Sequence, residues 1–231
     1  MKSGIPWGRI AAEFIAILAG VTLALLADDW RDFRRDRTDE RLALQEILAD
    51  LEADSVELAA QFKRQQQANA AVLWTLRNVE RDPPADTLLS GMTPLFYYTS
   101  YEAVSSGYRG LRDSGRLPLI RTVEIRRKVV DYYEVTQPYM KSFYDDFLAQ
   151  YTEFKGTTAP YIRLIPDSVG DVFAESFDPV LVRPWRAMRE DYRFLYETEE
   201  LGTIVSTFAL RIGPALEKNS ELRGLIRDVI G

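Results

Sequence analysis

The longest apolar stretch of the chain, Ile10–Ala27, carries a single charge, at Glu13. Because a helix rises about 1.5 Å per residue, this stretch reaches roughly 27 Å, close to the ~30 Å hydrocarbon core of a bilayer. Trp7 and Trp30 flank it at a spacing that suits the two aromatic belts of a membrane. The pattern predicts a transmembrane anchor over residues 10–30.

Two other interpretations of this stretch stay open. A cleaved signal peptide has a shorter apolar core, about 7–15 residues, and a small-residue cleavage site, and an alanine-rich run also suits a buried core helix. We favour a retained anchor because the core is longer and charged residues follow it directly. Glu13 lies one turn inside, so its carboxylate either reaches the interface or contacts a partner. Gly20 would allow a second helix to approach closely.

The charged residues beside the anchor do not agree on which side of the membrane the C-terminal domain lies. Lys2 and Arg9 precede the anchor, whereas more arginines follow it, which favours a cytoplasmic C-terminal domain. Acidic residues alternate with these arginines, and long domains can cross a membrane regardless of charge. The arginines after the anchor are Arg31, Arg34, Arg35, Arg37 and Arg41.

No proline or glycine interrupts Asp28–Arg81, which predicts one long helix continuous with the anchor. Its apolar positions recur in steps of four and three, as in a coiled-coil seam. The seam can pair with a second copy of the chain or pack inside its own bundle, and we favour the bundle. Its members are Leu44, Leu48, Leu51, Ser55, Leu58, Phe62, Gln65, Asn69, Val72 and Leu76.

The rest of the chain also reads as helical, with proline-rich connections. We expect a loop over Asp82–Pro94 and then a helix beginning near Tyr101 and ending at Gly115. Thr122 is expected to cap a helix that continues to about Lys155. Proline at position 138 should kink that helix.

The C-terminal third begins with Gly156–Pro184, an irregular connection with room for one short strand, such as Tyr161–Ile165. Helix follows from Trp185, and we expect Gly213 and Pro214 to break or bend it. Asn219 or Ser220 can then cap a short final helix. The predicted fold class is all-α. The predicted divisions are a flank (1–9), the anchor (10–30), a stalk that becomes the first bundle helix (31–81) and the remaining bundle (95–231).

Composition excludes several classes of function. The net charge is −6, with 35 acidic and 29 basic residues, which argues against a nucleic-acid partner. The chain has no histidine and no cysteine, so Ser-His-Asp and Cys-His catalysis and the usual zinc sites are absent. With 46% hydrophobic residues it can bury a substantial core. We expect no metal, no cofactor and no enzymatic activity.

The remaining polar and aromatic clusters are weak candidates for a site. Three arginines near the Ser-Gly turns can contact an anion, although ion pairing or capping is the commoner role. A run of aromatic residues suits a partner surface, since tyrosine is enriched at interfaces, or an ordinary core. The arginines are Arg109, Arg112 and Arg116, and the aromatic residues are Phe96, Tyr97, Tyr98, Tyr101 and Tyr108. The carboxylates that an enzyme would need are Asp145, Asp146, Glu197, Glu199 and Glu200.

Three segments resemble a family of single-pass bacterial membrane proteins that forms a domain of unknown function. They are Glu13–Trp30, with a Glu-led helix closed by Asp29-Trp30, then Ala43–Asp54, and Ser100–Tyr133 with its Ser-Gly and Tyr-Tyr pairs. The resemblance implies an anchored, mostly helical domain and no activity. It also implies a domain outside the cytoplasm, although relatives have a more basic N-terminus than Lys2 and Arg9 provide.

Three functions are consistent with these observations. The favoured one is a structural or interaction protein of the bacterial inner membrane, an accessory subunit of an assembly such as a photosynthetic or respiratory complex. Its partners would be the lipid bilayer and either other subunits or a second copy. The alternative is a ligand-binding sensor that signals through a partner helix, and a carboxylate-based enzyme is the least favoured.

Overall fold

The computed structural model describes residues 7–98, 100–166 and 177–231, with the side chains of residues 7–17, 19, 27, 166 and 177 outside this description. In chain order its elements are α1 (Trp7–Arg77), α2 (Ala85–Met92), the 3₁₀ turn η1 (Thr93–Phe96), α3 (Ser106–Asp113), the 3₁₀ turn η2 (Leu117–Leu119), α4 (Val123–Asp131), the π-helical turn η3 (Tyr132–Thr136), α5 (Gln137–Thr158), β1 (Ile162–Pro166), β2 (Phe177–Leu181), α6 (Trp185–Arg189) and α7 (Tyr192–Ile230).

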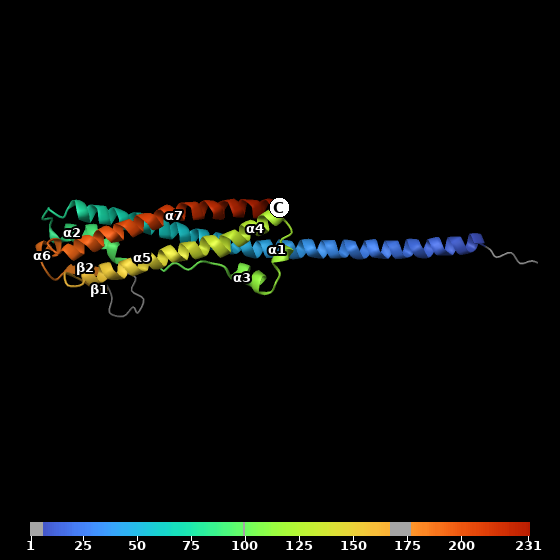
Figure 1. Cartoon of the computed structure of the whole chain (residues 1–231), viewed down its shortest axis with the longest axis horizontal. Coiled ribbons are helices and arrows are strands. Elements are labelled where there is room, and N and C mark those ends of the chain that lie inside the picture. Colours follow the sequence, from blue (N-terminus) through green and yellow to red (C-terminus); the bar gives the residue numbers. More distant parts are fainter. Residues whose placement is uncertain (1–6, 99, 167–176) are drawn as a thin grey trace, which may run out of the picture.

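The fold is a mostly helical bundle in which the C-terminal half of α1 packs along α7, and α5 packs against α7. Figure 1 shows the N-terminal half of α1 projecting from one end of this bundle as a free rod. At that near end lie α3, α4 and the C-terminus, while α2, α6 and the two strands gather at the far end. The bundle therefore has a near end, where the rod emerges, and a remote tip.

The predicted continuity of the N-terminal segment with the first bundle helix is confirmed, because α1 runs without a break for 71 residues. In the part of the chain that the structure describes, no helix has an apolar stretch long enough to cross a membrane. The residues from Met1 to Pro6, and the side chains of Trp7 and Glu13, lie outside the described residues.

Half of the predicted seam of α1 is buried, and the other half is displaced by one residue. The seam does pack inside its own bundle, and its buried centre line includes, as expected, Leu44, Leu51, Leu58, Gln65 and Val72. The other half of that line consists of positions one residue before the predicted ones, which are Ile47, Asp54, Gln61, Ala68 and Thr75. Three of these five residues are polar. A search for apolar positions therefore selects the residues that follow them and places this half of the seam one residue too late.

Two local predictions between α1 and α4 are wrong. The segment expected as a loop over Asp82–Pro94 contains helix α2, which buries Leu88 and Met92, one turn apart, in the core. The next helix, α3, begins at Ser106 rather than near Tyr101, because the chain before it runs extended beside α1. The predicted end at Gly115 is confirmed by its left-handed backbone, with φ of +68°.

The helix after Thr122 contains one extra residue rather than a simple proline kink. α4, η3 and α5 follow one another directly, and the π-helical turn η3 ends two residues before Pro138. Proline lacks an N–H and crowds the preceding turn, so a wider turn at this place accommodates it. The extra residue rotates Val135 and Tyr139 into solvent, where 56% and 48% of their surfaces are exposed.

Of the break or bend expected at Gly213 and Pro214, the break does not occur, because α7 continues through Pro214 to Ile230. Asn219 caps no helix end but is fully buried inside α7. At its start, α7 is capped by Asp191, which accepts a hydrogen bond from the Arg193 N–H at 2.9 Å. Packing along α1 thus outweighs the helix-breaking tendency of a single proline.

A short antiparallel pair of strands departs from the predicted all-α class. β1 and β2 pair in the register Ile162↔Leu181, and β1 overlaps the segment expected to hold a short strand. The strands lie at the tip of the bundle (Figure 1). The helices therefore carry the architecture, and the strands close its remote end.

Candidate interaction surfaces

The projecting rod of α1 carries large apolar side chains that no other described part of the chain covers. Successive helical residues turn by about 100°, so residues 18–26 point to all sides of the helix. Nothing lies within 4 Å of a Cβ placed on Gly20. The exposed fractions are 56% for Leu18, 52% for Val21, 67% for Leu23, 61% for Leu25 and 60% for Leu26. A helix that is apolar all round needs a surrounding apolar medium or partner.

A ring of contacts fixes the place where the rod enters the bundle. The Arg121 N–H donates to Glu40 Oε1 at 2.7 Å, and the Arg121 guanidinium pairs with Asp36. Closer to the rod, the Arg34 guanidinium lies 3.9 Å from the ring centroid of Trp30, which is itself 56% exposed. The loop before α4 therefore clamps α1 as it leaves the core.

Deeper in the bundle, two buried carboxylates of α1 hold the chain before and within α3. Asp50 accepts hydrogen bonds from the Ser106 hydroxyl at 2.9 Å and from the Tyr108 N–H at 3.1 Å. These donors belong to the first turn of α3, so Asp50 acts as its cap although it lies on another helix. Asp54, fully buried, accepts from the Val104 N–H at 3.3 Å.

The same Asp54 carboxylate connects α1 to η3 and α7. It accepts a hydrogen bond from the Tyr132 hydroxyl, and that hydroxyl accepts one from Asn219 Nδ2 at 2.9 Å. Asn219 also donates to the Leu51 carbonyl at 2.9 Å. Burial raises the pKa of Asp54, and the hydrogen bonds from Tyr132 and the Val104 N–H oppose this rise. Three elements, α1, η3 and α7, and the segment before α3 thus meet around one ionisable group.

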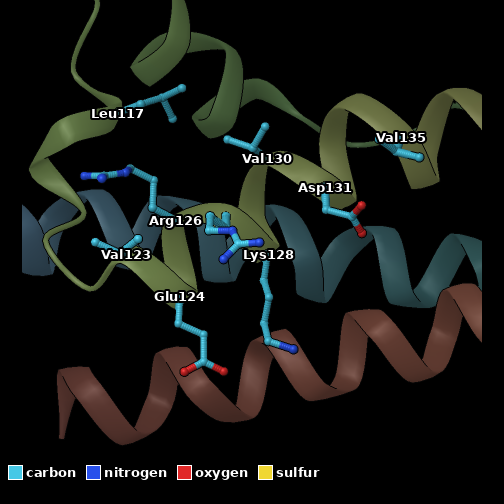
Figure 2. Close-up of a pocket in the computed structure, with 9 residues that line it drawn as sticks. Leu117, Val123, Glu124, Arg126, Lys128, Val130, Asp131 and Val135 are labelled. Carbon is cyan, nitrogen blue, oxygen red and sulfur yellow. The ribbon is translucent and has the colours of Figure 1, made fainter.

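An open groove of about 940 Å³ runs along α4. Figure 2 shows Glu124 and Lys128 extending from α4 toward α7. The Lys128 ammonium pairs with Glu221 of α7 at 2.7 Å, and the Asp131 carboxylate pairs with Lys218 at 3.0 Å. Because these charges neutralise one another across the groove, they bind α4 to α7 and present no convergent acid–base pair.

The predicted aromatic partner surface is mostly interior. Phe96, Tyr101 and Tyr108 are buried, so these three belong to the core and do not form an exposed surface. Only Tyr98 is open, with 47% of its surface exposed, and Tyr97 is half-buried. The core interpretation of this run is therefore the one that the structure supports.

The three arginines predicted to contact an anion do not form a common site. Arg112 is bound by two carboxylates, Asp113 at 2.9 Å and Glu134 at 3.0 Å, while Arg109 and Arg116 are exposed. The Tyr108 hydroxyl also donates to Glu134, at 2.8 Å, and burial together with this carboxylate raises the pKa of Tyr108 to about 12. The ion-pairing role accounts for Arg112.

The carboxylates considered for catalysis are dispersed. Asp145 pairs with Lys141 at the surface, whereas buried Glu197 accepts a hydrogen bond from Gln150 Nε2 at 2.8 Å. Asp146, Glu199 and Glu200 are exposed. Among the described residues no group of three or more His, Cys, Asp or Glu side chains is arranged to hold a metal ion.

The residue that sequence reasoning missed is Asp54. Asp50 and Asp54 are one turn apart, and the step of three and four residues along α1 places both beside the buried seam. That spacing was the available signal. Compared with protein-family models, curated proteins and solved structures, the chain matches none of them.

Proposed function

We propose that this chain is a membrane-anchored interaction protein of the bacterial inner membrane, an accessory subunit that presents its helical bundle to a larger membrane assembly. The observation that carries the proposal is the exposure of five large apolar side chains on a projecting helix, Leu18, Val21, Leu23, Leu25 and Leu26. Water is an unfavourable environment for such a surface, with a cost near 25 cal/mol per Å² of apolar area.

The described apolar residues of the rod supply only part of an anchor. Residues 18–26 cover about 14 Å, less than the ~30 Å of a bilayer core. The sequence adds apolar residues from Ile10 onward, so the proposed anchor is Ile10–Ala27, closed by Asp29 and Trp30. This segment is also where the chain resembles the family of single-pass membrane proteins.

The unbroken path of α1 favours a second candidate function. A helix that continues from the anchor into the core can transmit a rotation or translation of a partner helix to the bundle, as a sensor requires. The clamp between Arg121 and Glu40 would couple such a movement to α4. Ligand-induced changes confined to the bundle, with no partner helix, would contradict this second function.

Membrane retention tests the anchor directly. We expect the full chain to stay in bacterial membranes after a urea wash, because its exposed apolar residues lie in lipid. Leu23→Arg with Leu26→Arg should release it, since arginine near a bilayer centre costs about 2.5–3.5 kcal/mol. The matched control is Leu42→Arg, at an apolar residue that is 54% exposed on the bundle part of α1; it should remain in the pellet.

Release of the unmodified chain by urea would contradict the anchor. The subunit role is tested by solubilising the same membranes in a mild detergent and measuring the size of the particle that contains the chain. There we expect a particle larger than the 26.5 kDa chain in its detergent belt. A single chain without co-purifying proteins would contradict the subunit role and leave the anchor standing.

The side of the membrane can be read from one introduced thiol. We propose that the bundle lies outside the cytoplasm, as the family resemblance implies. Because the chain has no cysteine, Ser142→Cys places a unique thiol at an exposed position of α5. In intact cells that are permeable only at the outer membrane, a charged maleimide should label it fully. Labelling only after lysis would place the bundle in the cytoplasm.

A further inference from the structure

A second groove, of about 340 Å³, lies between α5 and α7 and is distinct in composition from the one along α4. Its floor is formed by buried residues, Thr136, Met140 and Ala215, and its walls by exposed ones, Val135, Tyr139 and Pro214. Arg211 and Lys218, both on α7, stand at its rim. The lining is apolar except at this cationic edge.

The groove lies where an irregular turn on one side faces a run of small residues on the other. On one side, η3 inserts the extra residue that turns Val135 and Tyr139 outward. On the other side, α7 presents Gly213, Pro214 and Ala215 in succession, which have little or no side chain to fill the space. π-Helical turns inside α-helices occur frequently at functional sites. The hollow is therefore part of the backbone design rather than a gap left by one side chain.

Arg211 is held at the rim by aromatic rings and not by a carboxylate. Its guanidinium lies 5.8 Å from the ring centroid of Phe143, which packs edge-to-face on Tyr139 at 4.8 Å. Among the described residues no acidic side chain pairs with Arg211. By contrast, Lys218 is engaged by Asp131 at 3.0 Å and by the Thr136 hydroxyl at 3.2 Å. Arg211 thus has free donors beside an apolar floor.

We propose that this groove binds a small amphipathic carboxylate, with its apolar body on Met140, Ala215 and Tyr139 and its anionic group on Arg211. Guanidinium and carboxylate match as a bidentate pair. The volume lies at the low end for ligand pockets, about 300–1,000 Å³, which suits a body of one or two rings or a short alkyl chain. A chain of net charge −6 repels anions in general, so a local free cation is needed to hold one. This binding is independent of the function proposed above.

Calorimetry with 2-naphthoate tests this site. The full chain is placed in nanodiscs of neutral phosphatidylcholine, and the heat measured with empty nanodiscs is subtracted. We expect saturable binding of 2-naphthoate with one site per chain. Naphthalene-2-methanol, which has the same rings and no charge, should bind about tenfold more weakly, and 2-naphthylmethylammonium should bind more weakly still.

Variants separate the charge from the apolar groove. Arg211→Gln should weaken the binding of 2-naphthoate about tenfold. Arg211→Lys keeps the positive charge, so it should reduce the affinity less. Val135→Trp fills the groove from its rim and should abolish binding without a change in charge. The matched control is Arg193→Gln, at an exposed arginine near the start of α7, which should bind like the wild type.

Three results would overturn the proposal. They are absence of saturable 2-naphthoate binding, equal affinity for the neutral alcohol, and unaltered affinity in Arg211→Gln. Circular dichroism verifies that each variant is folded. Arg211→Gln breaks no ion pair within the described part of the chain, so its fold should be intact and its affinity interpretable.

Discussion

Asp54→Ala is expected to lower the free energy of unfolding by about 2–4 kcal/mol. The substitution leaves the Val104 N–H and the Tyr132 hydroxyl buried without their acceptor, and each stranded donor costs about 1–3 kcal/mol. Removal of a buried charge offsets part of this loss. Because Tyr132 also bonds Asn219, contacts among α1, η3 and α7 should weaken together. Chemical denaturation followed by circular dichroism measures the difference.

The control for this prediction is Glu52→Ala on the same helix. Glu52 makes a solvent-exposed ion pair with Arg227 at 2.6 Å, and exposed pairs contribute about 0–1 kcal/mol. A loss in Asp54→Ala no larger than in Glu52→Ala would show that the buried network contributes little. The comparison therefore distinguishes burial from charge.

The pH dependence of Asp54 has a definite sign. Burial raises its pKa in the folded chain, so the folded chain holds the proton more tightly than the unfolded chain. This stabilisation is fully present below the unfolded pKa, about 3.9, and is lost as the pH rises through the folded pKa. Asp54→Asn, which does not ionise, should therefore gain free energy of unfolding relative to the wild type as the pH rises from about 4 through the folded pKa of Asp54. If the difference in free energy of unfolding between Asp54→Asn and the wild type did not change with pH, the ionisation of a buried Asp54 would be contradicted.

Gly202→Val is expected to lower the free energy of unfolding by about 2–3 kcal/mol, at the upper part of the range for overpacked cores. A Cβ at Gly202 would lie 2.7 Å from Val72 Cγ1, where α7 crosses α1. Valine at position 72 is branched at Cβ and has little rotational freedom to move aside. The two main helices would have to separate, and the melting temperature should fall by roughly 5–10 °C.

Another glycine of the same helix provides the control. No atom lies within 4 Å of a Cβ placed on Gly224, so Gly224→Ala should stabilise the chain by about 0.5–1 kcal/mol through helix propensity. In the Gly202→Val background, Val72→Ala should recover about 1 kcal/mol relative to the sum of the two single effects. Additive losses would indicate that the two residues do not meet as described.

The helical content of the chain could be predicted from its pattern because long periodic segments carry a strong signal. From Asp28 to its end at Arg77, α1 has no proline or glycine, and its continuity with the N-terminal segment was predicted. Half of its buried centre line was not predicted, because Asp54, Gln61 and Thr75 are polar residues inside the core. Asp54 and Gln61 are buried with hydrogen-bond partners from remote parts of the chain, which local pattern does not record, whereas Thr75 bonds to the Ala71 carbonyl one turn earlier.

The helix ends were harder to predict for the same reason. Pro214 has the local signal of a break, yet tertiary packing of α7 on α1 outweighs the loss of one backbone hydrogen bond. In the reverse direction, α2 forms within a proline-rich segment because Leu88 and Met92 reach the core. The groove beside Arg211 was unpredictable, since it requires the π-helical turn η3 to face the small residues 213–215 of a separate helix.

The unbroken helix α1 also sets a distance. From Ala27 to Arg77 it advances roughly 75 Å at 1.5 Å per residue, and the strands, α2 and α6 lie at that remote tip (Figure 1). In the proposed anchored state an upright α1 would hold the tip well beyond the lipid headgroups. A partner that extends only a short way from the bilayer would contact α3 and α4. Only an assembly that extends much further from the bilayer would contact the tip. The length of α1 would then determine which partners can contact the tip, according to how far each partner extends from the bilayer.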